Sequence, residues 1–166
     1  MDDMSQTVTT CLPLIFTYRD LIAGNKFQAT VAVRGRALAH LDADDEIWIE
    51  GVQPGGMSGT GVSLQEAHAD FRRGFTAILI EIASLSSDFA SFEAEVHRFF
   101  YEKNEVAMQE WGASIDPARA EQLAAQFALD RIKPDTEPYV LVQQKHEERL
   151  TPCDNSVVNP EPALAA

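Results

Sequence analysis

The alternation of apolar and polar residues predicts three consecutive β-strands in the first third of the chain. Apolar and β-branched residues dominate Leu12–Ile22, and apolar and polar side chains alternate along Phe27–Leu41. A third short strand is predicted at Ile47–Val52. Turn-forming residues at Gly24-Asn25 and in the acidic cluster Asp42–Asp45 separate these segments, so the strands are expected to form an antiparallel meander.

Helical periodicity replaces this alternation after residue 62. Ser63-Leu64-Gln65-Glu66 has the pattern of a capping box, in which the Ser63 hydroxyl accepts from the amide three residues on and Glu66 reaches back. The following residues repeat at helical spacing and predict one long helix whose buried face comprises Leu64, Ala67, Phe71, Phe75, Ile78, Ile82 and Leu85.

Further helices and a late strand are predicted in the second half of the chain. Asp88 begins a helix with a stripe of phenylalanines, and Val106–Trp111 either continues it or forms a separate helix. Asp116 followed by proline caps a helix near residues 118–131, and Tyr139–Val142 reads as a strand. The expected fold class is α+β: an antiparallel sheet of three to four strands packed against one long helix, with additional C-terminal helices and a late strand.

Length and composition favour a single domain. The chain has 166 residues, of which 45% are hydrophobic, enough to build a core without disulfides or metals. We expect one α+β domain over residues 1–150 and a disordered, proline-containing tail over residues 151–166. No apolar run approaches the roughly 20 residues of a membrane span, so no membrane partner is expected.

The charge balance narrows the class of partner. The 13 basic and 26 acidic residues give a formal net charge of −13, and no segment is basic. A phosphate-backbone footprint is therefore absent from the sequence, and direct binding of nucleic acid is not expected. An acidic surface would instead attract a basic partner.

Cysteine and histidine spacing indicates neither a disulfide nor a cofactor. Cys11 and Cys153 lie far apart in sequence, and neither has a histidine close to it along the chain. His40, His68, His97 and His146 are scattered, and a histidine on a helix flank is usually a polar surface residue. We therefore predict no metal and no cofactor, and, since the start does not have the pattern of a secretory signal, we expect the protein in the reducing cytoplasm.

Two segments could nevertheless hold a ligand. The glycine-rich stretch Gly55–Gly61 precedes a helix start, where free amides could bind an anion, but it lacks the pattern of a P-loop and is interpreted as a connector. Asp42, Asp44 and Asp45 could bind Mg²⁺ or Ca²⁺, but they lack the glycine and distal glutamate of an EF-hand and are interpreted as a solvated turn.

Trp48 is a candidate contact residue. It alternates with Ile47 and Ile49, so its side chain faces away from theirs and is exposed or covered by a partner. A large exposed aromatic side chain is a common anchor of protein interfaces. The candidate partner-binding residues are Trp48, Glu50, Gly55, Gly56, Gly59 and Gly61, and Ser63 and Glu66 are assigned a structural capping role.

Residues 26–85 resemble the HicB-like antitoxin family. The resemblance rests on Gly51-Val52-Gln53-Pro54-Gly55-Gly56 after a strand, and on Gly61-Val62-Ser63-Leu64-Gln65-Glu66-Ala67 at the start of an amphipathic helix. It implies a β-β-β-α-β layer that dimerises through its sheet and binds a small basic ribonuclease toxin. Residues 113–166 are acidic and contain no basic recognition helix, unlike the DNA-binding segment that many members add.

The function expected from the sequence is that of a non-enzymatic module that binds a basic protein partner and forms a homodimer. The alternatives are a metal-dependent enzyme that uses the Asp42–Asp45 turn, and a protein that binds a small anionic ligand in the Gly55–Gly61 loop.

 The expected module thus has no catalytic residue and no cofactor, and it acts through the partner-binding residues named above.

Overall fold

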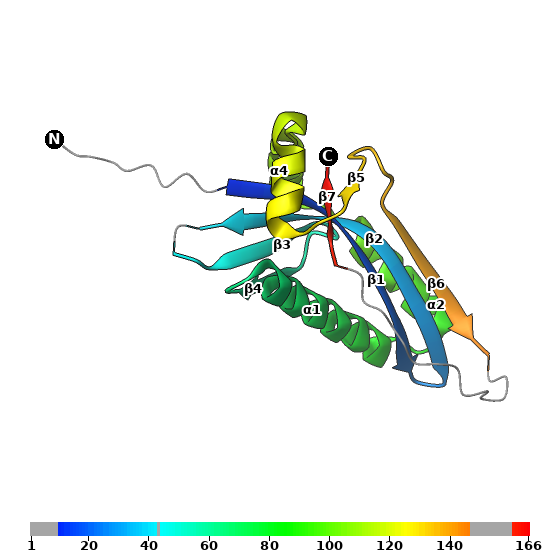
Figure 1. The fold of residues 1–166 in the computed structure, drawn as a ribbon. Helices are drawn as coiled ribbons and strands as arrows, with labels where there is room; N and C mark the ends of the chain where they lie inside the picture. Colours follow the sequence, from blue (N-terminus) through cyan, green and yellow to red (C-terminus); the bar gives the residue numbers. More distant parts are fainter. Residues whose placement is uncertain (1–9, 43, 147–160) are drawn as a thin grey trace.

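The computed structural model describes residues 10–42, 44–146 and 161–166, which form an α+β fold, as predicted (Figure 1). The strands and helices are β1 (Thr10–Gly24), β2 (Phe27–Leu41), β3 (Ile47–Gln53), β4 (Ser58–Gly61), α1 (Leu64–Leu85), α2 (Phe89–Tyr101), α3 (Glu105–Ala113), α4 (Pro117–Phe127), β5 (Arg131–Ile132), β6 (Tyr139–Lys145) and β7 (Ala163–Ala165).

A long hairpin of β1 and β2 organises the sheet. The two strands pair antiparallel along their whole length, from Thr10 opposite Leu41 to Gly24 opposite Phe27. The other edge of β2 is shared, because β3 pairs with its last six residues and β6 pairs with Gln28–Arg34. The remaining strands complete the order β4-β3-β2-β1-β7-β5, with β5 and β7 parallel. The described sheet therefore has seven strands, more than the three to four expected from the sequence.

The hairpin turn lies one residue later than the sequence pattern suggested. Gly24 still pairs with Phe27, so the turn residues are Asn25 and Lys26, and Lys26 has a positive φ of 62°. Gly24 is needed because the Phe27 ring lies over it: a Cβ at this position would lie 2.1 Å from a ring atom. The glycine therefore makes room for an aromatic ring within the strand pair, while the turn itself forms beyond it.

The segment predicted as a loop between residues 53 and 62 contains the edge strand β4. Ser58–Gly61 pairs antiparallel with β3, from Glu50 opposite Ser58 to Ile47 opposite Gly61. The strand escapes pattern recognition because two of its four residues are glycine, a residue that strands disfavour. A Cβ on Gly59 would lie only 2.4 Å from the backbone nitrogen of Phe71, so glycine allows β4 to pack directly on α1.

Two hydrophobic clusters lie on opposite sides of the sheet. The larger cluster joins β1 and β2 to the phenylalanine-rich faces of α1 and α2, with edge-to-face contact between Phe16 and Phe71 at a centroid distance of 5.0 Å. The smaller cluster surrounds Trp111 of α3, whose indole nitrogen donates to the carbonyl oxygen of Leu14 at 3.1 Å. On β3, the side chain of Trp48 remains exposed.

The predicted start of α1 is confirmed, but one residue of its predicted buried face is not. The Ser63 hydroxyl accepts from the Glu66 amide at 3.1 Å, and the Glu66 carboxylate accepts from the Val62 amide, one residue before the one expected. Leu64, Ala67, Phe71 and Phe75 are buried as predicted, Ile78 and Ile82 are only partly buried, and Leu85 is 81% exposed. Over 22 residues the buried stripe drifts around the helix, because 3.6 residues per turn do not match a fixed spacing of three or four.

The three later helices begin where their polar caps predicted. Side chains of Asp88, Asn104 and Asp116 accept from backbone amides at the starts of α2, α3 and α4. Asn104 thus separates α3 from α2, which resolves the alternative left open by the sequence. Helix α4 ends at Phe127 and not near residue 131, because Ala128 takes a left-handed conformation with φ of 54° and Arg131 enters strand β5.

The C-terminal residues correct the prediction of a disordered tail over residues 151–166. Ala163–Ala165 forms β7, which pairs antiparallel with Leu14 and Ile15 of β1 and parallel with β5. Its side chains are buried, and Leu164 is 1% exposed. Small and apolar residues fit this narrow position between two strands, so the end of the chain belongs to the folded domain. Residues 151–160 of the predicted tail lie outside the described residues.

Candidate functional site

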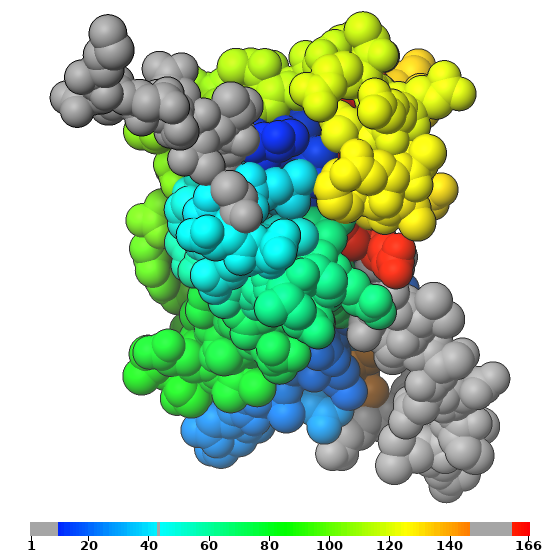
Figure 2. Space-filling model, turned by 60° about the vertical axis from the view of Figure 1, so that its left-hand side comes forward, coloured from blue at the N-terminus to red at the C-terminus, as the bar shows by residue number. Residues whose placement is uncertain are grey.

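One row of neighbouring side chains crosses four strands of the sheet, β1 to β4. Cys11 lies opposite His40, His40 opposite Trp48, and Trp48 opposite Thr60. Directly opposite residues on neighbouring strands share a face of the sheet, so β1, β2, β3 and β4 each contribute one side chain to this row. Figure 2 shows the neighbouring end of β2 and the start of β3, in cyan, at the molecular surface.

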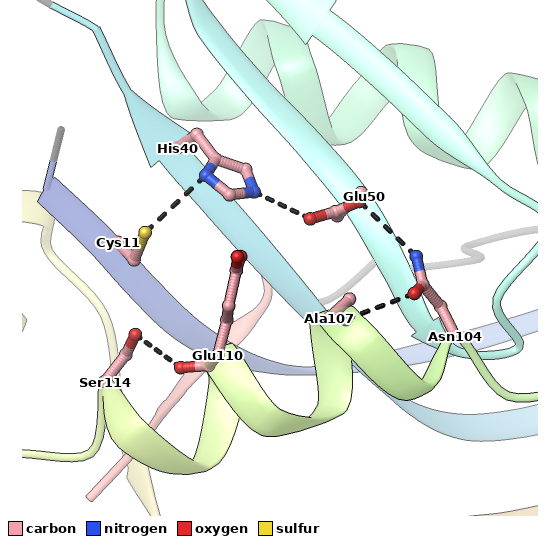
Figure 3. Close-up of polar contacts among 7 residues, drawn as sticks. All are labelled: Cys11, His40, Glu50, Asn104, Ala107, Glu110 and Ser114. Carbon is pink, nitrogen blue, oxygen red and sulfur yellow. Dashed lines mark hydrogen bonds and ion pairs between the residues drawn. The ribbon is translucent and has the colours of Figure 1, made fainter.

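A polar cluster connects this row to α3 (Figure 3). His40 Nε2 lies 2.8 Å from Glu50 Oε1, and its Nδ1 lies 3.5 Å from the sulfur of Cys11. Asn104 donates to the other oxygen of Glu50 at 3.5 Å, and the Glu110 carboxylate extends from α3 toward the imidazole. We call Cys11, His40, Glu50, Asn104 and Glu110 the polar cluster.

Trp48 borders an acidic hollow beside the cluster. Its ring stacks on that of His40 at a centroid distance of 4.7 Å and an interplanar angle of 22°. Trp48 is 42% exposed, which confirms that it faces away from the buried Ile49. The hollow has a volume of about 410 Å³ and is lined by His40, Asp42, Glu46, Trp48 and Thr60. An aromatic ring and carboxylates thus meet at one open surface.

The order thiol, imidazole, carboxylate has the form of a nucleophilic relay, but its electrostatics oppose that chemistry. Burial raises the pKa of the Cys11 thiol, and the negative charge of Glu110 raises it further. The thiol therefore keeps its proton near neutral pH, whereas a cysteine nucleophile acts as the thiolate. The same negative charges that disfavour a thiolate favour a bound cation.

Of the residues in this cluster, the sequence pointed only to Glu50, as a candidate partner-binding residue. Cys11 was expected to have no histidine near it, yet the strand pairing brings His40 alongside it. Glu110 of α3 and Asn104 at its start lie more than 50 residues after Glu50 in the sequence, and Asn104 was recognisable only as a possible helix start. The one available signal was the hairpin, since Cys11 and His40 lie equally far from a turn at Asn25-Lys26.

The acidic turn contributes no residue to the group of closely spaced ligand atoms found in the described part of the chain. Within the described ranges, the group whose ligand atoms all lie within 4.8 Å of one another consists of His40, Glu50 and Glu110, and no residue of the Asp42–Asp45 turn belongs to it. Asp45 instead has a positive φ of 62°, as expected for a turn residue.

The glycines of the Gly55–Gly61 stretch are placed by packing. Cβ atoms at Gly55, Gly59 or Gly61 would lie 2.4–2.5 Å from backbone nitrogens of α1 or of the segment before α3, and one at Gly56 would lie 3.3 Å from the ring of Phe99. The nearby amides of Thr60, Val62 and Glu66 already donate to Asp70, Glu66 and Ser63. This arrangement favours a connector over an anion site, and a contact of these glycines with a partner stays a prediction.

His68 differs from its expected place on the surface. It is 7% exposed, and burial followed by the charge of Arg72 lowers its pKa to about 4. Its Nε2 atom is buried and has no hydrogen-bond partner among the residues that the structure describes. His68 also borders a groove of about 780 Å³ between β1 and α1. His68 belongs to α1, which contributes no residue to the polar cluster.

Comparison with known proteins gives no match: no family model, no curated protein and no solved structure is similar to this chain. Among the described residues, no helix is both long and apolar enough to cross a lipid bilayer.

Proposed function

We propose that this protein is a non-enzymatic binding module that holds a basic protein partner in the acidic hollow beside Trp48. The observation that carries the proposal is the half-exposed indole ring of Trp48 at the rim of a hollow lined by Asp42 and Glu46. A large apolar ring on the surface costs solvation free energy unless a partner covers it.

The chemistry of the hollow fits a lysine or arginine side chain. The face of an indole ring attracts cations, and carboxylates around it add charge-assisted hydrogen bonds. The net charge of −13 acts in the same direction at longer range, since it attracts a basic protein and repels acidic ones. A small basic protein is also the partner that the resemblance to HicB-like antitoxins implies.

Residues 26–85, which carry the resemblance, contain β2, β3, β4 and α1, and the next strand along the chain, β5, begins only at Arg131. We therefore infer the class of partner and the homodimer from the resemblance, and the contact residues from the side chains that line the hollow. A homodimer predicts a sedimentation mass of about two chains at micromolar concentration, which analytical ultracentrifugation measures.

We place this interaction in the reducing cytoplasm. The supporting observation is that Cys11 forms no disulfide within the described part of the chain and contacts His40, as is usual for a cysteine in a reducing compartment.

Site-specific photo-crosslinking in the native host tests the proposal. A photoreactive amino acid at Thr60, which borders the hollow, is expected to capture a basic protein, whereas the same amino acid at the exposed Leu85 of α1 is not. The captured protein is then purified and titrated against the chain. Trp48→Ala should weaken binding at least tenfold, because exposed tryptophans are typical interface anchors, and should leave the unfolding midpoint nearly unchanged.

The ionic origin of the interaction is tested with the same purified pair. Glu46→Gln should slow association more than it speeds dissociation, and the effect should shrink at high salt. Equal capture at Thr60 and Leu85, or unchanged affinity of the Trp48→Ala variant, would contradict the proposed surface.

A further inference from the structure

We infer that His40, Glu50 and Glu110 form a binding site for a divalent transition-metal ion of the Zn²⁺ class. Each of the three side chains offers one ligand atom, and the three atoms lie within 4.8 Å of one another. They come from β2, β3 and α3, so the site would link the sheet to the helix that covers it (Figure 3). This inference goes beyond the proposed function, because it concerns the purified chain without any partner.

The spacing of the three atoms suits a small ion. Bonds of about 2.0–2.2 Å to nitrogen and oxygen place the ligands of a bound Zn²⁺ roughly 3–3.5 Å apart. His40 Nε2 and Glu50 Oε1 lie 2.8 Å apart, so they need to separate only slightly. Glu110 is an exposed residue on the surface of α3, and its flexible side chain can close the remaining distance by a change of rotamer.

The donor set indicates the class of ion. Imidazole nitrogen combined with carboxylate oxygens favours Zn²⁺ and other first-row transition metals, whereas Ca²⁺ and Mg²⁺ prefer sites built from oxygen alone. Three protein ligands leave a fourth position for water or for a group of another molecule.

Neighbouring side chains hold the ligands in place. When Nε2 of His40 binds the ion, its Nδ1–H is free to donate to the sulfur of Cys11, 3.5 Å away. Asn104 donates to the second oxygen of Glu50, and Trp48 stacks on the imidazole ring. Such contacts fix the orientation of a histidine and a carboxylate before the metal arrives.

Charge also favours an ion at this position. Glu50 and Glu110 approach the same imidazole, and in the described part of the chain neither forms an ion pair with lysine or arginine. A divalent cation between them would offset the repulsion of two carboxylates in a partly buried setting.

Metal titration of the full chain tests the inference. The protein is freed of metal with a chelator and titrated with Zn²⁺ by calorimetry and with Co²⁺ by visible absorption. We expect one ion per chain at this site and a rise in the unfolding midpoint with Zn²⁺. Glu110→Gln should weaken binding at least tenfold, whereas Glu105→Gln, which changes another exposed glutamate of α3 outside the cluster, should bind as the unmodified chain does.

Three results would overturn the inference. One is the absence of saturable binding of either ion by the unmodified chain. Another is unchanged affinity in the Glu110→Gln variant, which would place any bound ion elsewhere. The third is a sulfur-to-cobalt charge-transfer band that Cys11→Ser abolishes, because the ion would then bind the thiolate and the ligand set would be wrong. None of these results bears on the crosslinking at Thr60, so the two proposals succeed or fail separately.

Discussion

The side chain of His68 shows how burial sets the chemistry of a single residue. It lies on α1 beside the inward-facing Ala67, and no described residue forms a hydrogen bond with its Nε2 atom. Removing the imidazole from water disfavours its charged form, and the nearby guanidinium of Arg72 adds repulsion, so its pKa falls to about 4. His68 is therefore neutral in the folded chain over most of the pH range in which an exposed histidine titrates.

This pKa predicts a loss of stability in mild acid. An unfolded chain protonates His68 near pH 6.5, whereas the folded chain does so only near pH 4. The free energy of unfolding should thus be unaffected by this group above pH 6.5 and should fall by about 3 kcal/mol between pH 6.5 and pH 4. Urea unfolding at a series of pH values measures the slope.

His68→Leu is the comparison for this measurement. It removes the titrating group and keeps an apolar side chain of similar size, so the fall in stability between pH 6.5 and pH 4 should become smaller by that amount. Carboxylates such as Asp70 and Asp88, whose pKa values are lowered mainly by backbone amide donors, act equally in both proteins. Parallel pH profiles of the two proteins would show that His68 is not protected from protonation.

At the scale of single elements, helix starts are determined locally and strand partners are not. Ser63, Asp88, Asn104 and Asp116 each satisfy an amide two or three residues ahead, so the whole interaction lies within a few residues of sequence. Strand β4 depends instead on a partner strand and on the close approach of α1 at Gly59, neither of which its own four residues specify.

Removing the cap of α1 should lower stability measurably. Ser63→Ala leaves the Glu66 amide without its side-chain acceptor, so we expect a loss of about 0.5–2 kcal/mol in the free energy of unfolding. Ser84→Ala is the control, because this exposed serine lies inside the same helix and bonds only to the Glu81 carbonyl; it should change stability by less than about 0.5 kcal/mol. Chemical unfolding measures both, and equal effects would contradict the capping role.

At the scale of the whole molecule, the last residues of the chain complete the sheet. Strand β7 lies between β1, near the start of the described chain, and β5, which follows the helices. Leu164 of β7 belongs to the larger hydrophobic cluster, and its amide donates to the carbonyl oxygen of Asp130 just before β5. The two ends of the domain are therefore held together by one short strand.

Shortening one side chain of β7 tests this closure. Leu164→Ala should cost about 2–5 kcal/mol of stability, as expected for a leucine that is 1% exposed. Leu85→Ala removes the same atoms from a position that is 81% exposed and should have little effect. Urea unfolding of the two variants distinguishes a folded C-terminus from a loosely attached one, for which both substitutions would be nearly neutral.

The sequence by itself determined the features that depend on near neighbours. The α+β class, the long helix from Leu64, the polar caps and the outward direction of Trp48 all follow from alternation, helical spacing and hydrogen bonds within a few residues. These signals survive in a single sequence because both partners of each interaction lie in the same short window.

Only the tertiary structure decided the contacts between distant segments. A turn displaced by one residue changes every pair of a hairpin, so the meeting of Cys11 and His40 could not be derived once the turn was placed at Gly24-Asn25. Glu50 and Glu110 join them because α3 packs on the sheet through Trp111. Strand β7 pairs with the edge of β1 that β2 does not occupy. Many alternative pairings satisfy the same local patterns, and the packing of the complete core selects one of them.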